Sequence, residues 1–378
     1  MPALVYLLAL AVFAQGTSEF VLAGLLPAIA GDLDISLGQA GLLTSAFAAG
    51  MVVGAPTMAA IGRGWSPRSS LTGFLAAFVL AHVVGALTDS FTVLLVTRVV
   101  AAVANAGFLA ITLAVVARIA PADRQATGLA VILSGTTLAL IVGVPGGALV
   151  AGALGWRATL WVIVAICLPA LVAVLVATPA RADGQSAGHG RLRQELQTLR
   201  VGAVQLNITL AVLVNGATFC TFTYLAVIAT EAAGFADRTV PGLLAVFGIG
   251  AFLGVTAAGR FADRHWQRLI SVVLPLLLIG WAAMALVQNQ PVAVWALAGV
   301  QGALSFALGS TLISRIVSTA QGAPTMAGAF ATVALNTGAV IGPVAGGVAL
   351  PAVGSSGPAW ASAALVLMAG GVFCMAIR

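Results

Sequence analysis

The sequence predicts an all-α integral membrane protein whose twelve transmembrane helices form two pseudo-symmetric six-helix bundles. Three observations lead to this fold class: the composition, the number of long apolar stretches and a similarity between the two halves of the chain. Of the 378 residues, 61% are hydrophobic and only 7% are charged, with a mean hydropathy of +1.12. A soluble globular chain has about 25% charged residues, so this composition indicates a membrane protein.

Twelve stretches are long enough to cross a bilayer, which takes about 20 apolar residues in a helix. The predicted spans are 4–28, 39–61, 70–88, 91–117, 127–150, 158–178, 203–229, 240–261, 269–288, 292–315, 326–349 and 359–377. The one extended polar stretch, 179–200, is rich in Gly, Ser and Arg and predicts a linker with one short amphipathic helix. The chain therefore divides into a first bundle at 1–178, a cytoplasmic linker at 179–202 and a second bundle at 203–378.

The distribution of charge orients the predicted spans. All sixteen basic residues are arginines, and thirteen of them lie in the segments after the even-numbered spans or at the C-terminus. The segments on the opposite side hold five of the ten acidic residues and only Arg157 and Arg238. Because loops rich in positive charge stay in the cytoplasm, this asymmetry predicts that both termini are cytoplasmic. It also accounts for the net charge of +6 without a nucleic-acid partner.

The two halves repeat short motifs at an offset near 200 residues. The fifth span contains ALIVGVPGG at 139–147, and the eleventh contains GAVIGPVAGG at 338–347. The segment GRGWSPR at 62–68 corresponds to GRFADRHWQR at 259–268. Paired six-span halves are a known transporter architecture, with the substrate site near the midplane between them.

Glycine and proline predict a mechanical role for the fifth and eleventh spans. Small residues let helices approach closely, and Pro145 and Pro343 each remove a backbone donor and bend their helix. We expect these spans to pack and repack across the interface between the halves. The alternative is that Gly and Pro are frequent in membrane helices for general reasons.

These motifs resemble the signatures of the major facilitator superfamily, over the whole chain. GAVIGPVAGG resembles the antiporter signature of that family, GRFADRHWQR its cytoplasmic loop signature, and RVVAAVANAG at 98–107 the fourth-span signature built on a membrane arginine. The residues that carry the conformational motifs are Gly143, Pro145, Gly146, Gly147, Gly259, Asp263, Arg264, Arg268, Gly338, Gly342, Pro343, Gly346 and Gly347. The resemblance implies the major facilitator fold and a latch in the Asp263–Arg264 loop, for which ordinary positive-inside charge is the alternative.

Longer runs, at 11–33, 40–56, 82–110 and 142–149, resemble the chloramphenicol exporters within that superfamily. This resemblance implies a secondary active efflux transporter that exchanges protons for a small neutral amphipathic drug, chloramphenicol or a related amphenicol, by alternating access. It also implies a functional monomer in the bacterial cytoplasmic membrane that uses the proton gradient and no cofactor. Proton-coupled exporters of sugars or nucleosides share the Glu19–Phe20 pair and the fifth-span glycines, so they are the alternative.

Glu19 and Arg98 are the only formal charges well within the predicted spans. At 1.5 Å per residue, each lies roughly 10–12 Å from the same end of its span. Gln15 shares a helix face with Glu19, and Asn105 shares one with Arg98. We expect a shared polar cavity, in which the opposite charges lower each other's burial cost.

Glu19 is the predicted proton carrier, and Arg98 the fixed charge that tunes it. Burial disfavours the carboxylate while a nearby guanidinium favours it, and arginine itself does not lose its proton. Two alternatives stay open: a static ion pair that sets helix register, and direct binding of drug hydroxyls by Glu19. His82 in the third span is a second titratable candidate, although a lone histidine there is also typical of a packing residue.

The second half contributes neutral polar and aromatic side chains. Apolar walls with a few hydrogen-bonding groups suit a small neutral amphipathic molecule. Single polar residues in spans also join helices to one another, so each side chain is open to that interpretation. The predicted substrate cavity comprises Gln15, Glu19, Asn105, Asn207, Asn215, Thr218, Phe222, Tyr224, Gln301, Ser305 and Asn336.

Other classes of function find little support in the motifs. An enzyme would need a constellation such as H-E-x-x-H or G-x-S-x-G, and an ATP-driven pump would need G-x-x-x-x-G-K-[ST]; the sequence contains none of them. A sensor usually has a sizeable soluble output domain, and we identify no such segment. The three cysteines fit no metal spacing, so we expect no metal. The expected partners are a small-molecule substrate, protons and lipid, with no nucleic acid.

Overall fold

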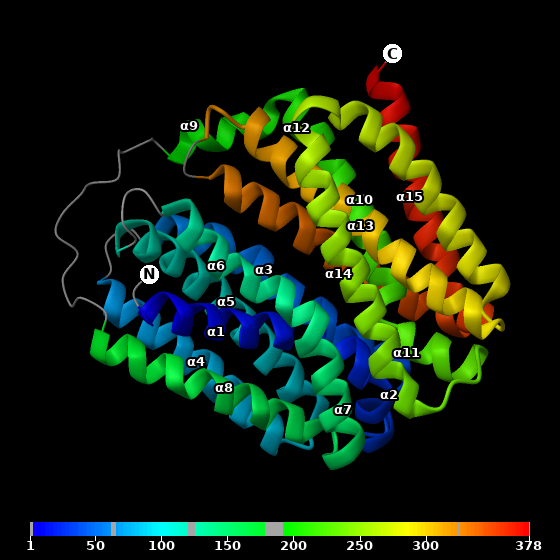
Figure 1. Ribbon diagram of the computed structural model, residues 1–378, viewed down its shortest axis with the longest axis horizontal. Coiled ribbons are helices and arrows are strands. Elements are labelled where there is room, and N and C mark those ends of the chain that lie inside the picture. The colour runs from blue at the N-terminus through cyan, green and yellow to red at the C-terminus, as the bar shows by residue number, and fades with distance from the viewer. Residues whose placement is uncertain (1–2, 62–65, 120–124, 178–191, 324–325, 378) are drawn as a thin grey trace.

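The computed structural model describes residues 3–61, 66–119, 125–177, 192–323 and 326–377, and every regular element in these ranges is a helix (Figure 1). The first half contains α1 (Ala3–Phe20), α2 (Leu22–Asp32), α3 (Leu37–Ile61), α4 (Pro67–Leu87), α5 (Phe91–Ile119), α6 (Gln125–Leu138), a π-helix (Ala139–Gly143), α7 (Val144–Leu154) and α8 (Trp156–Ala177). The linker contains α9 (Leu192–Gln197), and the second half contains α10 (Gly202–Phe222), α11 (Leu225–Val227), a π-helix (Ile228–Ala232), α12 (Val240–Val287), α13 (Pro291–Thr319), α14 (Ala327–Val353) and α15 (Gly357–Ile377).

The described helices provide twelve crossings of a membrane. By length and hydropathy they hold eleven candidate spans, and the last of these, 327–376, contains both α14 and α15. The chain turns between those two helices at Gly354, whose φ of 79° is a backbone conformation that favours glycine. The predicted all-α, twelve-helix membrane fold is confirmed.

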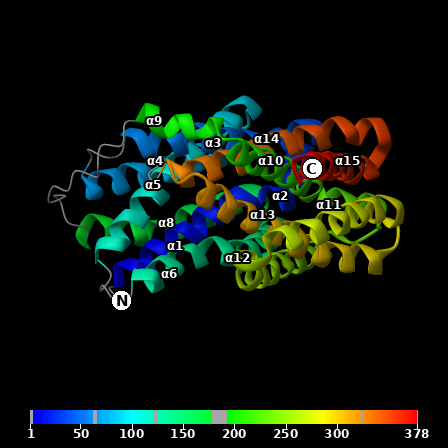
Figure 2. The ribbon, with the colours of Figure 1, turned by 90° about the horizontal axis from the view of Figure 1, so that it is seen from above.

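The helices form two groups, one from each half of the chain. Figure 1 shows the helices of residues 3–177 on one side and those from residue 202 on the other, and Figure 2, from a perpendicular direction, shows α3 and α14 next to each other where the groups meet. The groups meet along α3 and α14, and along α7 and α12. One apolar core belongs to the first half alone. The core of the second half also takes in a set of first-half side chains at the interface: Phe20, Ala23, Ala48, Leu140, Val144 and Ala148.

The first crossing is broken at Val21. We predicted one span at 4–28, whereas α1 ends at Phe20 and α2 begins at Leu22. The backbone ladder changes register there, because the Val21 N–H donates to the Thr17 carbonyl but the Gly24 N–H donates to the Val21 carbonyl, three residues back. Carbonyl groups in the last turn of α1 are therefore available to side chains from other helices.

The eighth and ninth crossings are two helices that meet at a kink, and α12 contains both of them. We expected spans at 240–261 and 269–288, and α12 runs from Val240 to Val287 with non-helical backbone angles at His265. The candidate spans on either side of the kink, Asp237–Arg260 and His265–Val287, agree with the two predicted spans. The chain kinks at His265 and continues as a helix.

A π-helix interrupts the fifth crossing beside Pro145. It covers Ala139–Gly143, and the Val144 N–H donates to the Ala139 carbonyl, five residues back. Pro145 has no N–H, and its ring would clash with the carbonyl of Ile141 in a regular α-helix, which favours the wider π-helical turn at this point. Pro343, by contrast, lies inside α14.

The motif glycines pack mainly inside each half, although the fifth and eleventh crossings that carry them also pack across the interface as expected. A Cβ on Gly143 would overlap the Thr17 side chain of α1, and a Cβ on Gly342 would overlap the Gly216 carbonyl of α10. These glycines therefore hold the fifth crossing against the first, and the eleventh against the seventh. In each half, the backbones of the paired helices approach so closely that there is no room for a residue larger than glycine.

Direct contacts between the halves also involve small residues. A Cβ on Gly347 of α14 would lie 3.2 Å from the Cα of Gly38 in α3. Further along the same helix pair, the Ser45 hydroxyl donates to the Val340 carbonyl at 2.9 Å. The backbones of α3 and α14 thus approach each other closely where the two bundles meet.

The linker joins the second half through a buried carboxylate. Helix α9 lies in the predicted linker, and Glu195 within it is only 2% exposed. Its Oε2 accepts a hydrogen bond from the Met326 N–H at 2.9 Å, just before α14 begins. A negative charge at a helix N-terminus is favourable, so Glu195 fixes the start of the eleventh crossing to the linker.

Arg157 ties three segments together at one end of the first half. Its guanidinium forms an ion pair with Asp32 at the end of α2, and its Nη2 donates to Asp89 Oδ1 at 2.6 Å and to the Thr88 carbonyl at 3.2 Å. The Trp156 indole N–H also donates to Asp32, at 3.1 Å. Hydrogen bonds from Arg157 and Trp156 hold the pKa of Asp32 below its ordinary value.

We expect Gly342→Ala to destabilise the protein, because the new methyl group would meet backbone atoms of α10 that cannot move aside. Overpacking of this kind costs about 1–3 kcal/mol of the free energy of unfolding. Thermal melting of the purified protein measures the loss as a lower Tm. Gly370→Ala in α15 is the matched control, because its Cβ would meet no atom within 4 Å. Equal Tm values for the two variants would contradict the close packing of α10 and α14.

We expect Arg157→Gln to lower the free energy of unfolding at pH 7 by at most about 1 kcal/mol, because the ion pairs are partly exposed to solvent. A carboxyl whose folded-state pKa is lowered stabilises the fold above its ordinary pKa, and this stabilisation is lost as pH falls through the lowered value. The difference between wild type and variant should therefore shrink below about pH 4. Melting curves at several pH values test this, with exposed Arg238→Gln as the control; a difference that persists in acid would exclude the role of Asp32.

Candidate functional site

The Arg98 guanidinium binds Ser18 within the first half of the molecule. Arg98 is 3% exposed; its Nη1 donates to the Ser18 hydroxyl at 2.8 Å and its Nη2 to the Ser18 carbonyl at 2.6 Å. The guanidinium also lies over the Phe47 ring of α3, 4.6 Å from the ring centroid. Residues from α1, α3 and α5 thus surround one buried positive charge.

The Ser18 hydroxyl connects Arg98 to His82. Ser18 Oγ lies 2.6 Å from His82 Nε2, and His82 Nδ1 lies 2.8 Å from the Phe78 carbonyl. A carbonyl only accepts, so Nδ1 carries the proton and donates it to Phe78, which leaves Nε2 as the acceptor of a neutral ring. The Ser18 hydroxyl then donates to His82 and accepts from Arg98. His82 is therefore a hydrogen-bonded member of the Arg98 cluster.

Glu19 lies beside this cluster without joining it. The residue is partly buried, and the charge of Arg98 acts on it through space. Among the described residues, Glu19 forms no hydrogen bond and no ion pair, whereas we expected it to pair with Arg98. Arg98 binds the neighbouring residue Ser18 instead, so the carboxyl group stays available to other partners.

The two neutral polar residues predicted beside this pair differ in their contacts. Gln15 is 1% exposed, and neither its amide oxygen nor its amide nitrogen has a partner among the described residues. The Asn105 amide donates weakly to the sulfur of Met51, at 3.7 Å. Gln15 thus has an unused donor and acceptor that are buried one helical turn from Glu19.

Aromatic side chains connect Glu19 to the second half. Phe20, the next residue, lies 6.0 Å from Phe219 of α10 between ring centroids. Phe219 meets Phe222 edge-on at 6.0 Å, and Phe222 stacks on Phe247 of α12 at 4.6 Å. Phe247 in turn lies 6.2 Å from Phe306 of α13. A continuous aromatic layer therefore begins beside the buried carboxyl group and crosses the interface between the halves.

Most polar side chains that we predicted to line a cavity in the second half donate to backbone carbonyls. The Asn215 amide donates to Leu335 of α14 at 2.7 Å, and the Gln301 amide donates to Leu277 of α12 at 3.0 Å. Asn207, Thr218 and Asn336 each donate to a carbonyl four residues back in their own helix. The Gln301 amide oxygen and the Ser305 hydroxyl have no partner among the described residues. The structure brings these side chains into the interior of the second half, where Asn215 and Gln301 join helices and the other three bond within their own helix.

Tyr224 links the end of the seventh crossing to the glycine and proline motif of the eleventh crossing. The residue is 0% exposed, and its hydroxyl donates to the Pro343 carbonyl at 2.8 Å. A Cβ on Gly41 of α3 or on Gly346 of α14 would overlap the tyrosine ring or hydroxyl. Tyr224 therefore packs between the halves, and its hydroxyl is not available to a substrate in this arrangement.

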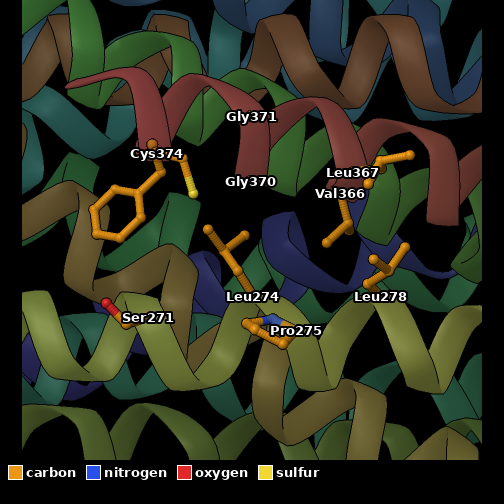
Figure 3. Close-up of a pocket in the computed structure, with 10 residues that line it drawn as sticks. Ser271, Leu274, Pro275, Leu278, Val366, Leu367, Gly370, Gly371 and Cys374 are labelled. Atoms are coloured by element: carbon orange, nitrogen blue, oxygen red, sulfur yellow. The ribbon is translucent and has the colours of Figure 1, made fainter. Parts of the chain in front are cut away.

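One predicted feature is not described by the structure, and one groove lies away from this site. The side chains of Asp263 and Arg264, the predicted latch, fall outside the described part of the structure. A groove of about 580 Å³ lies between the second part of α12 and α15 (Figure 3). It is lined by Ser271, Leu274, Pro275, Leu278, Val366, Leu367, Gly370, Gly371, Phe373 and Cys374. None of the predicted cavity residues lines this groove, which involves the second bundle alone.

Sequence reasoning missed Ser18 and most of the aromatic layer. Serine is common in membrane helices, and the partners of Ser18 lie 64 and 80 residues away in the chain, so no local pattern signals them. Phe219 and Phe222 are three residues apart on one face of α10, a spacing that links them to each other but not to Phe20.

Comparison with known proteins identifies the family. The model of the Major Facilitator Superfamily matches residues 8–298. The chain belongs to the major facilitator superfamily. As a member of this family it is a multi-pass membrane transporter, in agreement with its apolar helices and paired bundles.

Individual relatives cover nearly the whole chain. The chain is 54% identical over 371 residues to a chloramphenicol resistance protein of Streptomyces lividans, with 98% of this chain and 95% of the relative covered. It is 30% identical over 345 residues to the inner membrane transport protein YdhP of Escherichia coli K12, with coverage of 91% and 88%. Among solved structures, a mutant of the nucleoside transporter NupG has a TM-score of 0.82 at 12% identity, with 99% of each chain covered. A bacterial homologue of the lysosomal transporter Spinster has a TM-score of 0.78 at 16% identity, with 99% and 96% covered.

We expect Tyr224→Phe to lower the free energy of unfolding by about 0.5–1.5 kcal/mol, because the buried Pro343 carbonyl loses a donor. The measurement is the Tm of the purified variant. Tyr6→Phe is the matched control, since Tyr6 is 56% exposed and should lose nothing measurable. A Tyr224→Phe protein as stable as Tyr6→Phe would show that the hydroxyl contributes no stability.

Proposed function

We propose that this protein exports a small neutral amphipathic drug, chloramphenicol or a related amphenicol, in exchange for protons. The observation that carries the proposal is the position of Glu19: a carboxyl group that has no partner among the described residues, within the first crossing and beside the aromatic layer that links the halves. Family membership supports alternating access. The 54% identical relative, named a chloramphenicol resistance protein, supports the substrate.

Neutral groups around Glu19 suit such a substrate. The Gln15 amide offers a donor and an acceptor, and the layer from Phe20 to Phe306 offers aromatic surfaces. Chloramphenicol has an aryl ring, hydroxyls and an amide, which match these two kinds of contact. Among the residues that the structure describes, Arg98 is the one basic residue in this region, and it is already bound to Ser18, so the site does not favour an anion.

Glu19 carries the proton in this proposal, and Arg98 is the fixed charge beside it. When the site faces the acidic side, the carboxyl group takes up a proton. When it faces the cytoplasm, the proton leaves and drug binds. Drug and proton need not meet, provided that each changes the affinity of the site for the other.

The remaining elements of the proposal follow from charge and family. The arginine-rich segments lie in the cytoplasm, both termini with them, and the protein is a monomer in the bacterial cytoplasmic membrane. It is a transporter and not an enzyme, and it uses no cofactor, because the proton gradient supplies the energy. The two bundles, 1–178 and 203–378, are the bodies that alternate around the site.

The test is uptake of labelled chloramphenicol into inverted membrane vesicles under an inside-acid pH gradient, because inversion turns export into accumulation. With a gradient of about two pH units and one proton per drug, the limit is roughly 100-fold accumulation. We expect wild type to accumulate drug and Glu19→Gln not to do so, because glutamine cannot carry the proton.

Glu231→Gln is the matched control, since Glu231 is exposed in the segment after the seventh crossing. This variant should accumulate drug as wild type does. Equal accumulation by Glu19→Gln would refute Glu19 as the proton carrier. If wild type does not accumulate chloramphenicol, the amphenicol assignment fails, and sugars and nucleosides are the substrates to test next.

A further inference from the structure

Ser18 occupies the point where three helices of the first half meet. Its side chain is fully buried, and both its hydroxyl and its carbonyl accept hydrogen bonds from Arg98. The hydroxyl also donates to His82 on α4. Through its hydroxyl and its carbonyl, Ser18 therefore joins α1 to the His82 ring on α4 and to the Arg98 guanidinium on α5.

The break at Val21 makes the Ser18 carbonyl available. In an uninterrupted helix this carbonyl would accept from the N–H four residues on. Ser18 lies in the last turn of α1, where carbonyl groups lack helical partners. Arg98 Nη2 fills that role at 2.6 Å, so the interruption of the first crossing supplies a binding point for the guanidinium.

The hydroxyl is held in the orientation that Arg98 needs. Because His82 Nδ1 donates to Phe78, its Nε2 accepts from Ser18, and the lone pairs of the serine oxygen remain for Arg98 Nη1. The cavity that adjoins Arg98 and His82 has a volume of about 10 Å³, which is room for about one water molecule. A drug therefore has no access to this contact from that cavity, so the cluster positions a charge and does not bind the substrate there.

We propose that Ser18 is a positioning residue that holds the Arg98 guanidinium and keeps it from forming a direct ion pair with Glu19. The inference rests on the proposed role of Glu19 as proton carrier. Glu19 follows Ser18 in the chain and interacts with the charge of Arg98 through space, so a guanidinium released from the serine hydroxyl has a carboxylate beside it. A carboxylate in a buried ion pair holds its charge, because a proton could bind only by breaking the pair. Ser18 thereby keeps Glu19 able to exchange its proton.

Chemical labelling of Glu19 tests this inference directly. Dicyclohexylcarbodiimide is apolar and adds to protonated carboxyl groups, and mass spectrometry of the peptide that contains Glu19 quantifies the product. The full-length protein is purified in detergent without substrate and labelled at one fixed pH. We expect labelling of Glu19 in wild type and a several-fold decrease in Ser18→Ala. Some labelling should remain, because the backbone carbonyl at position 18 still binds Nη2.

Controls separate a positioning role from general damage. Ser70→Ala is the same substitution in α4, at a buried hydroxyl with no partner among the described residues, and should label as wild type does. The double variant Ser18→Ala/Arg98→Gln should recover labelling, because the competing charge is gone; a merely disordered site would not recover. If Ser18→Ala does not fold, Ser18→Cys carries the same expectation, because its thiol is similar in size but a weak acceptor.

The outcomes distinguish a failure of this inference from a failure of the proposed function. Wild-type labelling in folded Ser18→Ala, or no labelling of Glu19 in wild type, would overturn the inference. Because no drug is present, expected labelling together with failed chloramphenicol uptake would leave the role of Ser18 standing and remove only the proposed substrate.

Discussion

The hydrocarbon core of a bilayer offers no hydrogen-bond partners, and this constraint governs the polar contacts of the protein. Most buried amides and hydroxyls in the second half reach a backbone carbonyl, such as Asn215 to Leu335 and Tyr224 to Pro343. Arg98 makes the largest demand, because a guanidinium has five N–H donors and keeps its charge. The break between α1 and α2 meets part of this demand. The break between α1 and α2 and the buried charge of Arg98 on α5 therefore depend on each other.

The same constraint explains how the two bundles are built and how they meet. Inside each half, glycines bring the first and fifth crossings, and the seventh and eleventh, into backbone contact. Between the halves, the described contacts are mostly apolar: Gly38 against Gly347 and Phe20 against Phe219, with the Ser45 hydroxyl as a polar exception. An interface of this kind can rearrange without leaving many polar groups unpaired in hydrocarbon, whereas the interior of each bundle cannot.

The fold was predictable because each span is recognised from the hydropathy of about 20 consecutive residues, and its orientation from the charges of the segments beside it. Glu19 and Arg98 were also identifiable, because a formal charge within an apolar span is conspicuous. Their mutual geometry was not, since it depends on a helix break at Val21 that no proline or glycine marks at that position. The contacts of Asn215 and Gln301 depend on side-chain conformation and on neighbours 120 and 24 residues away. The glycine motifs were recognised, but the helices that they contact follow only from the tertiary structure.

The three cysteines differ sharply in their surroundings. Cys167 and Cys220 are 0% exposed in the cores of the first and second bundles, whereas Cys374 is exposed beside the groove between α12 and α15. A thiol-reactive fluorophore added to the folded protein will therefore attach at one place, near the end of the chain. Once Cys374 is blocked, any later reaction reports the opening of a bundle. The chain thus contains its own probes of unfolding, one in each half, without an introduced label.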